Sequence, residues 1–94
     1  MREETITQAL KFLKRNTNDF SKLNESISEA ESSFEDNDKT ETVKHLKTAE
    51  GIAIDMDETQ TIIDTIKYVL LLLEDKADEY PKDNIPDDLL GDLL

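Results

Sequence analysis

Few residues in this 94-residue chain have the types and spacing that catalysis requires. The chain contains no cysteine, and its single histidine, His45, is the one imidazole that could act as a general base near neutral pH. The neighbours Lys44 and Leu46 place His45 inside a predicted helix, where a surface or boundary position without a chemical role is the simpler interpretation. No Gly-x-Ser-x-Gly element is present to supply a serine nucleophile. We therefore expect no catalytic residues and no enzymatic activity.

The known metal and cofactor motifs do not fit the sequence either. A carboxylate-bridged di-iron bundle needs two Glu-x-x-His units, and His45 does not have that spacing. Asp36 and Asp38 resemble the start of a calcium-binding loop, but Glu41 stands where that loop requires a glycine. The two glycines lie too far apart to form a phosphate-binding loop. The sequence thus predicts neither a metal site nor a cofactor.

The elements that would position any site are predicted to be helices. Both prolines lie in the last 14 residues, and no Asn-Gly or Asp-Gly hairpin turn appears. In the first third, apolar residues recur every seven positions, with further apolar residues three or four positions on, which is the stripe of an amphipathic or coiled-coil helix. Residues 16–19 favour helix caps and would allow a kink or a break, but the stripe keeps its phase across them, so a continuous helix over about 4–35 is favoured. The seven-residue series is Ile6, Leu13, Phe20, Ile27 and Phe34.

A second helical region follows a predicted turn at 36–38. Asp38 and Glu41 have the spacing of a capping box, which predicts the start of a helix. The apolar pattern then continues to about residue 79, and a break near residue 56 would divide 39–79 into two helices. Because the linker at such a break would be very short and contains neither glycine nor proline, one helix, straight or bent, is favoured.

These elements predict an all-α fold. We expect an antiparallel helical hairpin or a three-helix bundle of long amphipathic helices, with a short C-terminal helical tail. A chain of this length forms one domain, and we assign the bundle to residues 1–80. Residues 81–94 are predicted to form a proline-containing linker and a short acidic, leucine-rich tail.

Residues 61–73 contain more apolar side chains than one neighbouring helix can cover. Ile63, Ile66, Leu70 and Leu73 are assigned to the core, and the rest of the helix surface would have to be covered by the tail, a further helix, a second copy or a partner. The tail itself either folds back over its own bundle, which is slightly favoured, or docks in a groove on a partner. The candidate interface residues are Tyr68, Leu71, Leu72, Leu89, Leu90, Leu93 and Leu94.

The charge of the chain narrows the classes of partner. Eleven bases against 23 acids give a formal net charge of −12. Because such a surface repels phosphates and anionic lipids, we expect no direct nucleic acid binding and no membrane association. The absence of cysteine fits a reducing compartment, so a cytoplasmic location is expected.

Binding, not catalysis, is therefore the expected function. The favoured hypothesis is a small non-enzymatic protein–protein interaction module, such as an adaptor, a small chaperone or a regulatory subunit, that binds a protein partner, forms a homodimer, or both. The surplus apolar surface of residues 61–73 leads us to expect that it self-associates. The alternative is an acidic inhibitor, such as an immunity protein or a nucleic-acid mimic, that acts on a basic target. Binding by charge mimicry would weaken steeply as salt rises, whereas binding through leucines would not.

Overall fold

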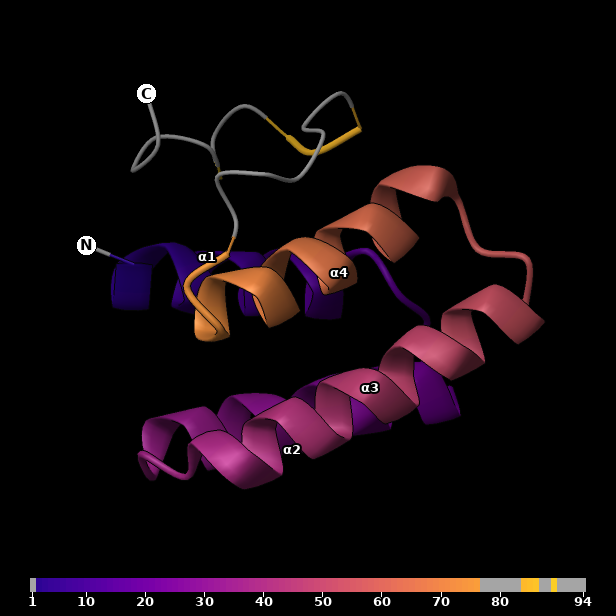
Figure 1. The fold of residues 1–94 in the computed structure, drawn as a ribbon. Helices are drawn as coiled ribbons and strands as arrows, with labels where there is room; N and C mark the ends of the chain where they lie inside the picture. The colour runs from indigo at the N-terminus through magenta and orange to yellow at the C-terminus, as the bar shows by residue number, and fades with distance from the viewer. Residues whose placement is uncertain (1, 77–83, 87–88, 90–94) are drawn as a thin grey trace.

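The described part of the chain contains four helices and no strand in the computed structural model (Figure 1). The structure describes residues 2–76, 84–86 and 89. The all-α fold class and the helical bundle are confirmed, but the helices number four, not two or three, and each has only 14 or 17 residues. The helices are α1 (Arg2–Arg15), α2 (Lys22–Glu35), α3 (Lys39–Asp55) and α4 (Gln60–Leu73). Within the described residues, none of them has the length and apolarity needed to cross a lipid bilayer.

The predicted unbroken helix over 4–35 is wrong, because polar side chains satisfy the last carbonyls of α1. The Thr17 hydroxyl donates to the Leu13 carbonyl at 2.8 Å. The amide Nδ2 of Asn24 donates to the Lys14 carbonyl and to the Thr17 Oγ1, each at 3.0 Å. Thr17 and Asn24 are both buried. The last turn of α1 is therefore completed by side chains, and the chain can leave the helix without stranding buried carbonyls.

The three later helices begin at side-chain caps. In each, the cap oxygen accepts a hydrogen bond from the backbone N–H three residues on, which satisfies a donor that the helix leaves unpaired. The predicted cap at Asp38 is confirmed, with Oδ1 3.1 Å from the Glu41 nitrogen. The caps are Ser21 for α2, Asp38 for α3 and Thr59 for α4.

The favoured single helix over 39–79 is also wrong, since α3 ends at Asp55 and α4 begins at Gln60. After α2, α3 and α4, one residue takes a left-handed backbone conformation: Asn37 (φ 60°), Asp57 (φ 56°) and Asp75 (φ 62°). The next N–H then bonds to the carbonyl five residues back, which is the Schellman motif. These bonds join Asp38 to Ser33 (2.9 Å), Glu58 to Ala53 (3.0 Å) and Lys76 to Leu71 (2.8 Å).

Successive helices run in opposite directions, so the bundle has an up-down-up-down topology (Figure 1). α1 and α4 lie side by side in one layer, and α2 and α3 lie side by side in the other. The α2–α3 pair makes the most extensive contact, and α1 packs against both α2 and α4. This is the arrangement of an antiparallel four-helix bundle.

All four helices and the C-terminal segment contribute to the core. α2 and α3 bury small side chains, Ala30 on α2 with Ala49 and Ala53 on α3, and small contact residues let two helices approach closely. In the seven-residue series, Ile6, Leu13 and Ile27 are buried and Phe34 packs against the core, whereas Phe20 does not.

Candidate functional site

The predicted interface residues on α4 lie largely inside the molecule. Tyr68 and Leu72 are 0% and 3% exposed, and Leu71 is partly buried against the core. Ile66 and Leu70, which the sequence pattern assigned to the core, are buried as well. A partner cannot reach Tyr68 or Leu72 in this conformation, so their placement does not support a surface role.

The C-terminal segment helps to cover this part of α4. The Tyr68 hydroxyl donates to the Leu89 carbonyl at 3.3 Å, and the Asn84 amide donates to the Asp64 carboxylate at 2.9 Å. Ile85 and Leu89 are each 4% exposed and belong to the core cluster. The described part of the tail thus folds back on its own bundle. The other predicted interface residues, Leu90, Leu93 and Leu94, lie outside the described residues.

Three large apolar side chains in the described part are exposed: Phe20 (98%), Ile54 (51%) and Met56 (49%). Phe20 precedes α2, Ile54 lies in the last turn of α3, and Met56 is the C-terminal cap of α3. We name these three residues the apolar tip. The assignment of Phe20 to the buried stripe is wrong because α1 ends at Arg15, so the helical phase does not continue to Phe20.

Hydrogen bonds hold the turn that carries Phe20. The Phe20 N–H donates to the Asn18 side-chain oxygen at 3.1 Å. The Ser21 hydroxyl and the Ser21 N–H both donate to the Asn18 carbonyl, at 2.7 and 3.0 Å. Asn18 thus forms an Asx turn, and Ser21 ties this turn to the start of α2. The exposed ring therefore stands on a hydrogen-bonded turn.

The residues of the apolar tip lie at the same end of the bundle. In the antiparallel α2–α3 hairpin, Glu29 is level with His45, since Glu29 Oε2 lies 3.1 Å from His45 Nδ1. Counting nine residues back from Glu29 reaches Phe20, and counting nine forward from His45 reaches Ile54. Figure 1 shows the start of α2 and the end of α3 at this end of the molecule. The turn before α2 and the turn after α3 therefore lie at the same end of the bundle.

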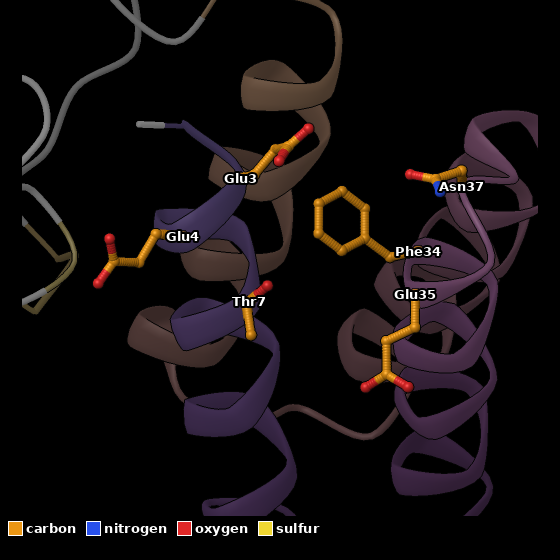
Figure 2. Close-up of a pocket in the computed structure, with 6 residues that line it drawn as sticks. All are labelled: Glu3, Glu4, Thr7, Phe34, Glu35 and Asn37. Carbon is orange, nitrogen blue, oxygen red and sulfur yellow. The ribbon is translucent and has the colours of Figure 1, made fainter.

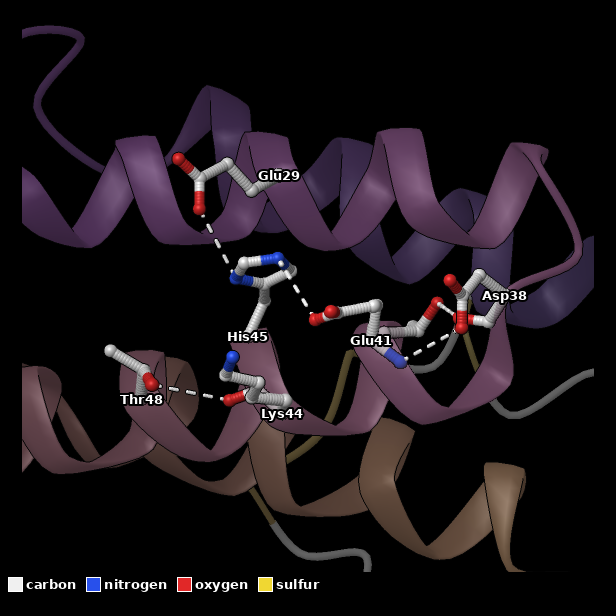
Figure 3. Close-up of polar contacts among 7 residues, drawn as sticks. Glu29, Asp38, Glu41, Lys44, His45 and Thr48 are labelled. Carbon is white, nitrogen blue, oxygen red and sulfur yellow. Dashed lines mark hydrogen bonds and ion pairs between the residues drawn. The ribbon is translucent and has the colours of Figure 1, made fainter.

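His45 joins α2 to α3, as Figure 3 shows. Its Nδ1 lies 3.1 Å from Oε2 of Glu29 on α2, and its Nε2 lies 3.7 Å from Oε2 of Glu41 on α3. Ser28, Ser32 and Ser33 line the same shallow hollow. Because both ring nitrogens face carboxylates, neither is directed to accept a proton from these serines. The arrangement suits an inter-helix bridge, which becomes a pair of ion pairs when the imidazole is protonated.

An acidic hollow of about 310 Å³ lies between the start of α1 and the end of α2 (Figure 2). The ring of Phe34 forms its apolar wall, and the Glu3 side chain extends beside that ring. The hollow is lined by Glu3, Glu4, Thr7, Phe34, Glu35 and Asn37. Figure 2 shows Glu4 extending away from this ring on the other side of α1, so a cationic side chain against the ring would meet the Glu3 carboxylate. Sequence periodicity does not indicate this hollow, because its walls come mainly from α1 and α2, which are brought together only by the break after α1.

The described residues provide no group of three or more His, Asp or Glu side chains placed to hold a metal ion. Asp38, which resembled part of a calcium loop in the sequence, caps α3. The two ring nitrogens of His45 face glutamates from two helices, Glu29 on α2 and Glu41 on α3. Asp38 and His45 therefore have structural roles: Asp38 caps α3, and His45 bridges α2 and α3.

The fold and surface define a small all-α protein: an antiparallel four-helix bundle with an apolar tip at one end and an acidic hollow on its side. Comparison of the chain with protein-family models, with curated proteins and with solved structures found no match.

Proposed function

We propose that this chain is a non-enzymatic helical interaction module of the cytoplasm, which acts as an adaptor, a small chaperone or a regulatory subunit by binding another protein. The observation that carries the proposal is the exposure of Phe20, which is 98% accessible on a hydrogen-bonded turn. Phenylalanine, like tyrosine and tryptophan, contributes strongly to the energetics of protein interfaces. A second and a third exposed apolar side chain, Ile54 and Met56, lie at the same end of the bundle.

The hydrogen bonds around Phe20 favour binding on entropic grounds. An interface loop that is disordered before binding loses conformational freedom when a partner docks, which weakens affinity. Here Asn18 and Ser21 already constrain the backbone on both sides of Phe20. A partner would therefore gain the burial of the ring without ordering the turn.

The proposed partner is a different protein. Self-association was expected from the surplus apolar surface of α4, but Tyr68 and Leu72 are buried, with Ile85 and Leu89 of the same chain in the same core cluster. The argument for a homodimer through α4 therefore no longer applies. Binding through the apolar tip takes its place in the proposal.

Affinity capture from the native host, with light scattering on the purified chain, tests the proposal. The wild-type chain is expected to capture a specific protein, and the Phe20→Ser variant to capture less of it. A stable monomer that captures nothing would overturn the proposed function.

The acidic hollow favours a second candidate, an inhibitor of a basic target. A lysine or arginine of the target would contact Phe34 and the carboxylates of Glu3 and Glu35. A cation over an exposed aromatic ring contributes roughly 0.5–1 kcal/mol, so such an inhibitor would depend mainly on charge. Its affinity is expected to fall steeply between low and physiological salt, and Phe20→Ser is expected to leave it unchanged.

A further inference from the structure

We propose that the apolar tip, formed by Phe20, Ile54 and Met56, is a docking site for a partner segment in which apolar side chains are flanked by lysine or arginine. This inference rests on the proposed function and specifies the partner's chemistry. It follows from the exposure of these side chains, from their shared end of the bundle, and from the charge that surrounds them.

The charge around the apolar tip is negative. Residues 16–22 and 54–59, which carry the tip, contain four acids and one base, Lys22, for a formal charge of −3. The acids are Asp19, Asp55, Asp57 and Glu58, of which the first three are exposed and Glu58 is half-exposed. A partner that covers the tip must therefore meet carboxylates at its rim.

The bases at the end of α1 do not cancel this charge. The Lys14 ammonium lies 3.0 Å from Glu31, a residue of the second half of α2 and therefore away from the tip. Arg15 lines a hollow with Lys11, Glu31 and Glu35. Long side chains on a helix lean towards its N-terminus, and for α1 that direction leads away from the tip.

The negative rim argues against a second copy of this chain as the occupant. A symmetric dimer through the tip would place the same patch of both copies face to face. Asp19, Asp55 and Asp57 of one copy would then lie against the carboxylates of the other, and like charges across an interface are unfavourable. A segment with apolar side chains at its centre could pack against the ring of Phe20. Bases at its edges would form ion pairs with the surrounding acids, Asp19, Asp55, Asp57 and Glu58.

Three labelled helical peptides and the full-length chain test the proposal in an anisotropy titration. The first peptide carries leucine and phenylalanine on one face and lysine on the flanks. The second replaces its lysines by glutamate, and the third replaces its apolar residues by serine. We expect the first peptide to bind the wild-type chain roughly tenfold or more tighter than either of the others.

Paired variants separate the tip from the rest of the acidic surface. Phe20→Ser combined with Met56→Ser is expected to weaken binding of the first peptide by roughly tenfold or more. Asp55→Lys combined with Glu58→Lys is expected to weaken it by about threefold and to improve binding of the glutamate peptide. The matched control, Asp36→Lys combined with Glu74→Lys, places the same charge change on the exposed C-terminal caps of α2 and α4, at the end of the bundle opposite the tip, and is expected to alter affinity by less than about twofold. Circular dichroism verifies that each variant is folded.

Several outcomes would overturn the inference. These are failure of the first peptide to bind, unchanged binding by the Phe20→Ser, Met56→Ser variant, equal binding of the serine peptide, or a dimer in light scattering that the same variant dissociates. If the wild-type chain and this variant capture the same host protein equally, the proposed function stands and the tip is not its site. If nothing is captured and no peptide binds, both proposals are wrong.

Discussion

Asn24 shows how one buried side chain determines where two helices separate. Its amide bonds to the Lys14 carbonyl and to the Thr17 hydroxyl, both at the end of α1, while its own N–H is capped by Ser21. Because Asn24 is only 8% exposed, water cannot readily replace these contacts if the amide is removed. The side chain therefore holds the end of α1 against the start of α2.

Replacing Asn24 by alanine is expected to lower the free energy of unfolding by about 1–3 kcal/mol, since it leaves buried polar groups unpaired. Asn16→Ala is the matched control, because the Asn16 amide donates to the Phe12 carbonyl at 2.8 Å in an exposed position where water can take its place. That variant is expected to change the free energy by less than about 0.5 kcal/mol. Urea denaturation followed by circular dichroism measures both, and equal losses would contradict this account of α1.

Thr65 differs from Asn24, because its buried polar group has no hydrogen-bond partner in the described part of the chain. Among the described residues, its hydroxyl is a buried side-chain oxygen without a hydrogen-bond partner, and the residue is 0% exposed. Thr65→Val keeps the shape and removes the unpaired hydroxyl, so it is expected to raise the free energy of unfolding by about 1 kcal/mol. Thr42→Val, at a residue equally buried whose hydroxyl donates to the Asp38 carbonyl at 2.8 Å, is expected to lower it by a similar amount. The same sign for both valines in urea denaturation would contradict the prediction.

At the scale of the element, the positions at which helices end are the feature that the periodic sequence pattern predicts least well. Helical content, the turn at 36–38 and the cap at Asp38 are all readable from the sequence, because each depends on residues within one or two turns. Residues 56–59 contain neither glycine nor proline, and for that reason the sequence favours a continuous helix there. The chain uses Asp57 in the left-handed conformation there, and aspartate also occurs in ordinary helices. The cap-favouring residues 16–19 are a local sign of the break after α1, but the bond from Asn24 to the Lys14 carbonyl, ten residues away, is not readable from local sequence rules.

α3 contains Gly51 in its interior, where glycine has a lower helix propensity than alanine. A Cβ at this position would meet nothing within 4 Å. Gly51→Ala is therefore expected to raise the free energy of unfolding by about 1 kcal/mol, through the higher helix propensity of alanine alone. The reverse change two residues on, Ala53→Gly, removes a fully buried methyl and is expected to lower it by about 1 kcal/mol or more. Thermal unfolding compares the two, and a loss of stability in Gly51→Ala would show that the glycine is required.

For the whole molecule, the sequence pattern indicated correctly that α4 needs cover on more than one side. It did not indicate which residues would be covered, because that depends on where the C-terminal segment returns. Tyr68 and Leu72 were assigned to an interface and are buried. Phe20 was assigned to the core and is exposed, because one unrecognised helix end moved it out of the stripe. Periodicity thus predicts the core as far as each helix extends and no further.

The returning C-terminal segment should contribute to stability as the core does. Leu89→Ala is expected to lower the free energy of unfolding by about 2–5 kcal/mol, because it removes most of a side chain that is 4% exposed in the core. The matched control Ile54→Ala, at a residue 51% exposed, is expected to change it by less than about 0.5 kcal/mol. Guanidinium denaturation measures both. If Leu89→Ala lowered the free energy of unfolding as little as Ile54→Ala, the stability of α4 would not depend on the C-terminal segment.

The order in which the helices pack also has a consequence for synthesis on the ribosome. α1–α2, α2–α3 and α3–α4 are contacts between consecutive helices, and short-range contacts of this kind form rapidly, on the order of microseconds to milliseconds. The α1–α4 contact joins the two ends of the bundle instead. During translation, the apolar face of α1 is made before α4 and before Ile85 and Leu89, so this face lacks these partners until they have been synthesised. The nascent chain is therefore expected to depend on α2 and α3 as a preformed hairpin, and to complete its core only after Leu89 has left the ribosome.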